Sequence, residues 1–290
     1  MGLIDNGSVS YRDPSFYTQK RKAEIKIGRK LSREEFIKDY YIPSEDAGKM
    51  ASTETSIFDP ALCETMYIWF TKENDLILDP FAGGSVRGIV AVETGRHYIG
   101  VDLRQEQIDA NNINAEEICN GEKPKWICGD SVSIKTLAGG EYDFIMTCPP
   151  YGDLEVYSDN PADISNMSEE EFDETYTKIL YNSVEMLKDN RFACIVVGNY
   201  RDKKGNLRDL VGLTVKAMEK AGAHYYNDII YITPAGSLPV RVGKSFTSTR
   251  KVGRQHQYCL IFVKGDGKTA TERLGEVELP DLEELFEEQI

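Results

Sequence analysis

Two short stretches of this sequence combine residue types that can bind a ligand and act on it. The first, Asp75–Gly88 (DLILDPFAGGSVRG), runs from a short apolar segment through Asp79 into a turn with paired glycines at Gly83. Glycine has no Cβ, so its backbone can come close to a ligand. The second stretch is Thr147–Tyr151 (TCPPY), where Pro150 cannot donate a hydrogen bond and leaves the preceding carbonyl free as an acceptor.

Acidic or polar residues also follow four successive apolar runs. Asp79, Asp102 and Asp130 come directly after three of these runs or one residue later, and the TCPPY turn follows the fourth. If the runs are parallel strands, all four ends lie along the carboxyl edge of one sheet, where such folds bind their ligands. An acid at the tip of the second strand is suited to accept hydrogen bonds from ribose hydroxyls.

The elements that must position these residues alternate between strand and helix patterns. This order predicts an α/β fold, a Rossmann-like doubly wound and mostly parallel sheet with a C-terminal antiparallel hairpin. Strands are expected at Leu76–Leu78, His97–Val101, Lys125–Cys128, Tyr142–Met146, Phe192–Val197, Tyr225–Thr233 and Gln257–Val263. Helices are expected near Ser85 and at Arg33–Tyr40, Ser56–Phe70, Leu103–Asn120, Ser168–Lys188 and Leu207–Ala221, the fifth opened by a capping box.

Bulk composition favours a reduced cytoplasmic protein. The 290 residues are 41% hydrophobic, without an apolar run long enough to span a membrane or an apolar signal-peptide core at the N-terminus. The six cysteines are far apart and form no CxxC pair, so we expect neither a disulfide framework nor a metal site.

The charge distribution is more informative than the net charge of −14. The segment Ile229–Lys264 contains no acid, whereas Gly265–Ile290 has nine acids against two basic residues. A concentrated basic segment suits a phosphate-binding face on an otherwise acidic protein. Its candidate nucleic-acid contacts are Arg241, Lys244, Arg250, Lys251 and Arg254.

The two chemical stretches together resemble a known family, the S-adenosylmethionine-dependent DNA methyltransferases that modify adenine N6 or cytosine N4. The DPFAGG segment that begins at Asp79 is similar to the cofactor motif of that family, usually written DPFAGSG. The TCPPY turn resembles its catalytic motif, in which Asp, Asn or Ser precedes Pro-Pro and an aromatic residue. The resemblance covers roughly residues 53–264, and its two motifs are specific in combination.

The resemblance implies a role for each matching position. Cofactor contacts would come from Asp79, Pro80, Phe81, Ala82, Gly83, Gly84, Asp102, Asp130 and Phe58, and the target base would be held by Cys148, Pro149, Pro150 and Tyr151. Asp102 would bind the ribose and Asp130 the adenine amino group of S-adenosylmethionine. The implied organisation is an N-terminal arm (1–50), a methyltransferase domain (51–264) with a basic DNA-contacting loop (234–255), and an acidic tail (265–290).

The expected reaction moves a methyl group to the exocyclic amino group of a flipped DNA base, with adenine N6 preferred slightly over cytosine N4. Two alternatives stay open. One is a methyltransferase that acts on RNA or on a protein glutamine; the other is a weakly active or inactive module that binds cofactor and nucleic acid. Cys148 keeps the second alternative open, because a thiol is a weak hydrogen-bond acceptor at a position where the family has Asp, Asn or Ser.

Overall fold

The computed structural model describes residues 58–152, 157–232 and 238–276, together with residues 23, 24, 26–29, 31 and 36. The chain divides into two compact units, 1–57 and 58–290. In the first unit, Leu31 and Phe36 are buried and pack with Ala23. The helix predicted at 33–40 lies outside the described residues except for Phe36, which is helical.

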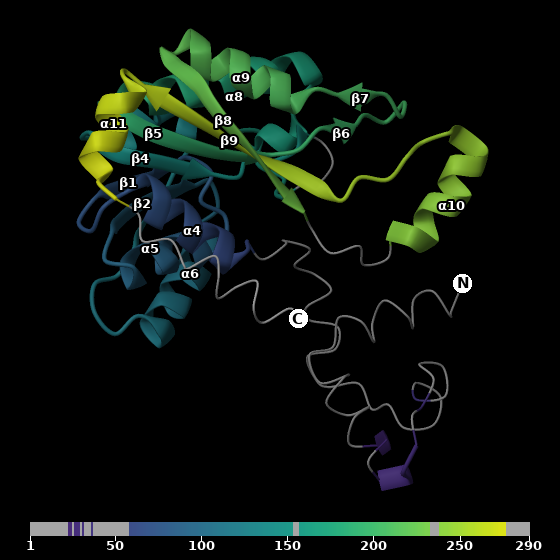
Figure 1. Ribbon diagram of the computed structural model, residues 1–290. Helices are drawn as coiled ribbons and strands as arrows, with labels where there is room; N and C mark the ends of the chain where they lie inside the picture. Colours follow the sequence, from purple (N-terminus) through teal and green to yellow (C-terminus); the bar gives the residue numbers. More distant parts are fainter. Residues whose placement is uncertain are drawn as a thin grey trace. The chain divides into compact units, whose positions relative to one another are not determined.

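The second unit is built on a seven-stranded sheet in the order β3-β2-β1-β4-β5-β9-β8 (Figure 1). The strands are β1 (Leu76–Asp79), β2 (His97–Asp102), β3 (Lys125–Cys128), β4 (Tyr142–Thr147), β5 (Leu187–Val197), β8 (Ala223–Ile232) and β9 (His256–Lys264). The first five pair in parallel, and β9 runs antiparallel to both β5 and β8. This topology confirms the predicted doubly wound sheet with its antiparallel C-terminal hairpin.

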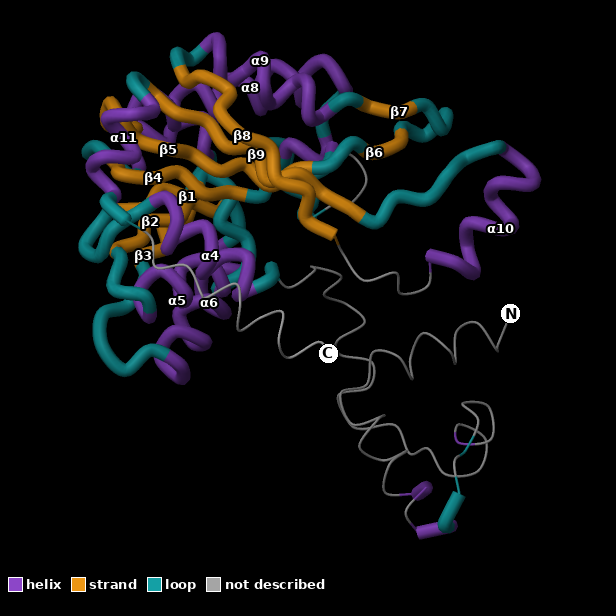
Figure 2. Tube along the Cα trace, viewed as in Figure 1, coloured by secondary structure: helices purple, strands orange, loops and turns teal. Residues whose placement is uncertain are grey.

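Helices cover both faces of the sheet and give a three-layer arrangement (Figure 2). One face is packed by α4 (Pro60–Phe70), α5 (Val86–Glu93), α6 (Gln105–Ile118) and α11 (Gly267–Leu274). The other is packed by α7 (Ile134–Leu137), α8 (Glu169–Met186) and α9 (Leu210–Lys220). Alternating side chains of the strands point to the two faces, so the core forms two apolar clusters, one on each side of the sheet. Among the described residues, no helix is long and apolar enough to cross a membrane.

Local signals explain where several helices begin. Asp59 caps α4 by accepting hydrogen bonds from the Ala61 and Leu62 N–H groups, so the helix expected from Ser56 starts at Pro60. Ser168 and Glu171 form the predicted capping box at the start of α8. On α8, Phe172 and Tyr176 are buried in the core.

Three expected segments differ in the structure. The segment 234–255, predicted as a loop, contains helix α10 (Leu238–Thr249), because Leu238, Val242 and Phe246 repeat at helical spacing and a Pro at the second helical position is tolerated. The predicted helix at 207–221 begins only at Leu210, since residues 207–208 form strand β7. The strand expected from Phe192 begins at Leu187, directly after α8.

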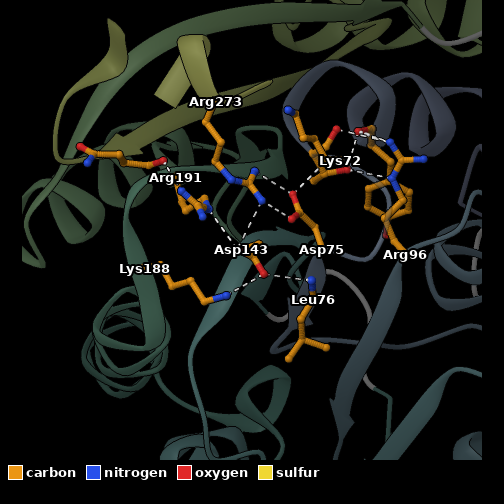
Figure 3. A network of polar contacts seen from close by, with 11 residues as sticks. Lys72, Asp75, Leu76, Arg96, Asp143, Lys188, Arg191 and Arg273 are labelled. Carbon is orange, nitrogen blue, oxygen red and sulfur yellow. Dashed lines mark hydrogen bonds and ion pairs between the residues drawn. The ribbon is translucent and has the colours of Figure 1, made fainter. Parts of the chain in front are cut away.

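The first part of the predicted acidic tail is a structured helix. In α11, Ala270 is buried in the core, and Arg273 pairs with Asp75, the residue before β1 (Figure 3). Beside this pair, Asp143 on β4 accepts hydrogen bonds from Lys188 at 2.8 Å and from Arg191 at 3.0 Å. Helix α11 is therefore packed against the sheet.

Candidate active site

Asp79 ends β1 with a completely buried carboxylate. Its Oδ2 accepts hydrogen bonds from Arg87 Nε at 2.6 Å and from the Tyr98 hydroxyl at 2.8 Å. Its Oδ1 accepts from the Thr147 hydroxyl at 2.6 Å and from the Phe81 N–H at 3.1 Å. Burial would lower the pKa of Arg87, but the Asp79 carboxylate outweighs it and raises that pKa, so the buried guanidinium stays protonated. Through these hydrogen bonds, Asp79 fixes the start of the glycine turn at Phe81 and links it to β4 at Thr147.

The glycine turn is held by hydrogen bonds to its carbonyl groups. Arg87 Nη2 donates to the carbonyls of Phe81 at 2.8 Å and Ala82 at 2.9 Å, and the Asn111 side chain donates to the Gly83 carbonyl at 2.7 Å. Gly83 has a φ of +50°, a conformation that L side chains rarely adopt. A Cβ at Gly83 or Gly84 would meet nothing within 4 Å, so the turn faces open space.

Asp102 ends β2 next to this turn. Its Oδ2 accepts the Gly83 N–H at 3.0 Å and its Oδ1 accepts the Arg104 N–H at 2.9 Å. Burial raises the pKa of Asp102, and the two N–H groups offset part of that rise. The carboxylate is partly exposed, and each oxygen has a further lone pair for a ligand hydroxyl.

Asp130, directly after β3 and Gly129, lies at the same edge of the sheet. Its Oδ1 accepts the Val132 N–H at 2.9 Å. The neighbouring Ser131 hydroxyl donates to the Pro80 carbonyl at 2.6 Å, which joins the end of β3 to the turn after β1. The structure therefore brings the three predicted strand-end acids to one edge, as parallel pairing requires.

Phe58 lies against the same network. Its ring stacks on the Arg87 guanidinium, with Cζ 4.7 Å from the ring centroid. The next residue, Asp59, accepts a 2.6 Å hydrogen bond from the Tyr231 hydroxyl on β8. The segment before α4 therefore contacts both α5, through Arg87, and β8, through Tyr231.

The TCPPY turn follows β4, the neighbour of β1 in the sheet. Thr147 is completely buried, and Pro149 is buried, whereas Cys148 and Tyr151 are partly exposed. Burial raises the pKa of the Cys148 thiol, so the group is protonated at neutral pH. The Tyr151 hydroxyl is buried, and burial together with the neighbouring Cys148 thiol raises its pKa well above the ordinary value.

The predicted nucleic-acid contacts are only partly described. Arg241 and Lys244 lie in α10, but their side chains are outside the described residues. The Arg250 guanidinium is 5.4 Å from the centroid of the Phe246 ring. Arg254 is directed back to the domain, where its Nη1 donates to the Asn199 carbonyl at 2.8 Å.

Sequence reasoning missed Arg87 and a short hairpin after β5. An arginine inside the apolar helix sequence VRGIVAVE was a usable signal, because a buried charge needs a partner. The hairpin consists of β6 (Tyr200–Arg201) and β7 (Leu207–Arg208), which are too short for a periodic pattern. The turn residues between them, DKKGN, were the only local signal.

Comparison with known proteins agrees with the two motifs. A family model described as DNA methylase matches residues 10–113 and 142–288, most of the chain. The chain belongs to the DNA methylase family. Among the solved structures similar to this chain is TrmN from Thermus thermophilus, with a TM-score of 0.50 and 13% identity over 73% of this chain and 51% of that one. That likeness concerns the fold alone.

Sequence relatives of this chain match over shorter stretches. It is 41% identical over 61 residues to the type II methyltransferase M2.DpnII of Streptococcus pneumoniae, which is 20% of this chain and 23% of that protein. It is 33% identical over 73 residues to the DNA adenine methyltransferase YhdJ of Escherichia coli, which is 22% of this chain and 25% of that protein. The chain thus spans about a quarter of the length of these curated relatives.

Proposed function

We propose that this protein transfers a methyl group from S-adenosylmethionine to an exocyclic amino group of a DNA base. The observation that best supports this proposal is the hydrogen bond between Thr147 and Asp79. It joins the DPFAGG turn to the TCPPY turn at the carboxyl ends of adjacent parallel strands. Ligands of such sheets bind at that edge. Membership of the DNA methylase family supports the same reaction.

The residues at the glycine turn fit S-adenosylmethionine. The open space over Gly83 and Gly84 lets a ligand approach the backbone, and the partly exposed Asp102 carboxylate can accept from ribose hydroxyls. Asp130 would bind the adenine amino group, and Phe58 and Phe81 would make apolar contacts with the cofactor. When bound, the cofactor supplies an electrophilic sulfonium methyl group.

The TCPPY turn would hold the target amino group. An exocyclic amino nitrogen is a poor nucleophile because its lone pair is delocalised into the ring. The Pro149 carbonyl can accept a hydrogen bond from the amino group, and Pro150 stiffens the turn. Tyr151 offers a ring face for the base, and base–aromatic stacking contributes roughly 1–3 kcal/mol. Positioning and fixed dipoles then lower the barrier without a strong general base.

The target base must leave the duplex, because its amino group is otherwise engaged in base pairing. Adenine N6 is the preferred target, and the relative YhdJ, a DNA adenine methyltransferase, supports that preference over cytosine N4. Basic residues at the carboxyl edge, Arg254 among them, would neutralise DNA phosphates.

The test uses the purified protein, S-adenosylmethionine with a tritiated methyl group, and unmethylated duplex DNA. The DNA is digested to nucleosides and separated by chromatography. We expect label in N6-methyladenine, and no label with the Pro149→Ala/Tyr151→Ala double variant. Label in N4-methylcytosine would confirm methyl transfer to an amino group and would show that the target base is cytosine rather than adenine. Cofactor binding without label in DNA would contradict the proposal and favour an RNA substrate, a protein glutamine or an inactive binding module.

A further inference from the structure

The β6–β7 hairpin extends from the carboxyl end of β5, on the same edge of the sheet as the candidate site (Figure 1). Its turn is closed by Asp202, whose Oδ1 accepts the Asn206 N–H at 2.7 Å. At its base, Arg208 pairs with Asp173 at 2.9 Å and with Glu169 at 3.1 Å, both on α8. The hairpin is therefore anchored to the domain at its base.

The tip of the hairpin is basic and exposed. Arg201, Lys203 and Lys204 have exposed side chains within four consecutive positions. The acid between them, Asp202, uses its carboxylate to close the turn. In a chain with a net charge of −14, such a local excess of positive charge marks a surface for a polyanion.

The hairpin also lies against Gly152, the residue that directly follows the TCPPY turn. Gly152, the residue after Tyr151, has a φ of +54°, and a Cβ at that position would overlap the Tyr200 hydroxyl. A cavity of about 400 Å³ lies between the hairpin and the start of α8. Gly152, Phe172 and Tyr200 line it together with the two lysines of the tip, Lys203 and Lys204. The two lysines of the tip therefore line the same cavity as Gly152, which directly follows the candidate catalytic residue Tyr151.

The hairpin is linked to the basic segment as well. Arg254 donates to the carbonyl of Asn199, the residue before β6. The Lys251 side chain lies so close to Gly205 in the hairpin turn that a Cβ there would overlap its Nζ. Lys251, Arg254 and the hairpin tip consequently form one connected basic surface.

We propose that the β6–β7 hairpin is a DNA-binding arm that contacts the backbone phosphates of the strand bearing the target base. This inference rests on the proposed function, and it names the element that holds the strand beside the TCPPY turn. Each lysine that neutralises a phosphate releases counterions from the DNA. Phosphate contacts by the arm should therefore contribute to the decrease of DNA affinity with rising salt concentration.

The test compares two variants that change the net charge equally. Lys203→Glu/Lys204→Glu alters the arm, and Lys216→Glu/Lys220→Glu alters two exposed residues of α9, the helix that follows the arm. Binding of a fluorescent duplex is measured by anisotropy between 50 and 300 mM salt. We expect the arm variant to lose at least about tenfold in affinity and its log–log salt slope to fall by about 2, against little change in the control.

Two further measurements separate the possible failures. Cofactor binding by calorimetry should be the same in both variants, which shows that the arm variant is folded. A milder Lys203→Ala/Lys204→Ala variant should lower the slope without adding repulsive charge. Equal DNA binding by the arm variant and the control, or no duplex binding by the wild type, would overturn the inference. If wild-type binding to the duplex depends on the arm but no methyl group is transferred, the DNA-binding role of the arm holds and the proposed function is contradicted.

Discussion

The Thr147 hydroxyl donates a 2.6 Å hydrogen bond to Asp79 Oδ1, across 68 positions of sequence. Both residues are completely buried, and they end β4 and β1, two adjacent parallel strands. The glycine turn and the TCPPY turn therefore share one carboxylate as their common support. Arg87 and Tyr98 bind the other oxygen of the same carboxylate, so the support is fully engaged.

Replacing Thr147 with Val keeps the shape of the side chain but leaves the buried Asp79 oxygen one donor short. A buried polar group without its partner costs about 1–3 kcal/mol, more for a charged group. We expect the free energy of unfolding to fall by about 2 kcal/mol and cofactor affinity to fall as well, measured by urea titration and calorimetry. Thr147→Ser retains the hydroxyl and should stay near wild type. A fully stable Thr147→Val protein would contradict the supporting role of this bond.

Cys148 occupies the position where the resembled family has Asp, Asn or Ser. Its thiol is protonated at neutral pH and is a weak acceptor. A carboxylate or amide oxygen at this position should hold the substrate amino group better, so Cys148→Asn should raise kcat about tenfold, the equivalent of 1.4 kcal/mol. The measurement is single-turnover methylation with the tritiated cofactor. Cys148→Ala serves as the control, and an Asn variant no faster than the Ala variant would show that position 148 does not contact the amino group.

Gly152→Ala should impair methyl transfer rather than cofactor binding. The added Cβ would overlap the Tyr200 hydroxyl, and its φ of +54° costs a non-glycine residue about 1–2 kcal/mol. We expect kcat to fall at least about tenfold, with the cofactor Kd unchanged. Adding Tyr200→Ala removes the overlap but leaves the backbone strain, so the double variant should recover part of the loss. No recovery would assign the whole effect to the backbone.

The Asp143 network should make stability dependent on pH in the acid range. Burial raises the pKa of Asp143, but hydrogen bonds from Lys188, the Leu76 N–H and Arg191 outweigh it and hold the pKa below the ordinary value of 3.8. A carboxyl with a lowered pKa in the folded state stabilises the protein above its unfolded pKa, and that contribution is lost as the pH falls through the folded value.

Asp143→Asn should therefore lower the free energy of unfolding by about 3 kcal/mol at pH 7. The difference from wild type should shrink below a pH of about 3.8, measured by urea titration at several pH values. Asp189→Asn is the matched control, since Asp189 lies nearby on β5 with 79% of its side chain exposed. A difference that stays constant down to pH 3 would show that the charge of Asp143 is not the stabilising property.

Strand ends were predictable because two independent signals agree there. An apolar run that stops at Asp79 or Asp102 marks both the strand and its polar tip, and parallel pairing then collects the tips at one edge. The capping box at Ser168 was equally readable, since both of its partners are three residues apart. Local chemistry of this kind does not depend on the rest of the fold.

The environment of a residue was much harder to predict. Asp79 has the sequence context of a ligand contact, yet its partners Arg87, Tyr98 and Thr147 come from three other elements and bury it. The segment with α10 was predicted as a loop, although it contains apolar residues at helical spacing along with the weak helix formers Pro239 and Gly243. The β6–β7 hairpin depends on tertiary anchors such as the pair between Arg208 and Asp173.

The pair between Arg273 and Asp75 has a consequence for biosynthesis. The two residues are separated by 198 positions, so the ribosome must add all the intervening strands before the guanidinium becomes available. Before α11 is synthesised, Lys188 and Arg191 can already pair with Asp143, whereas Asp75 does not yet have its partner Arg273. A nascent chain arrested just before position 273 should thus leave Asp75 without its guanidinium partner.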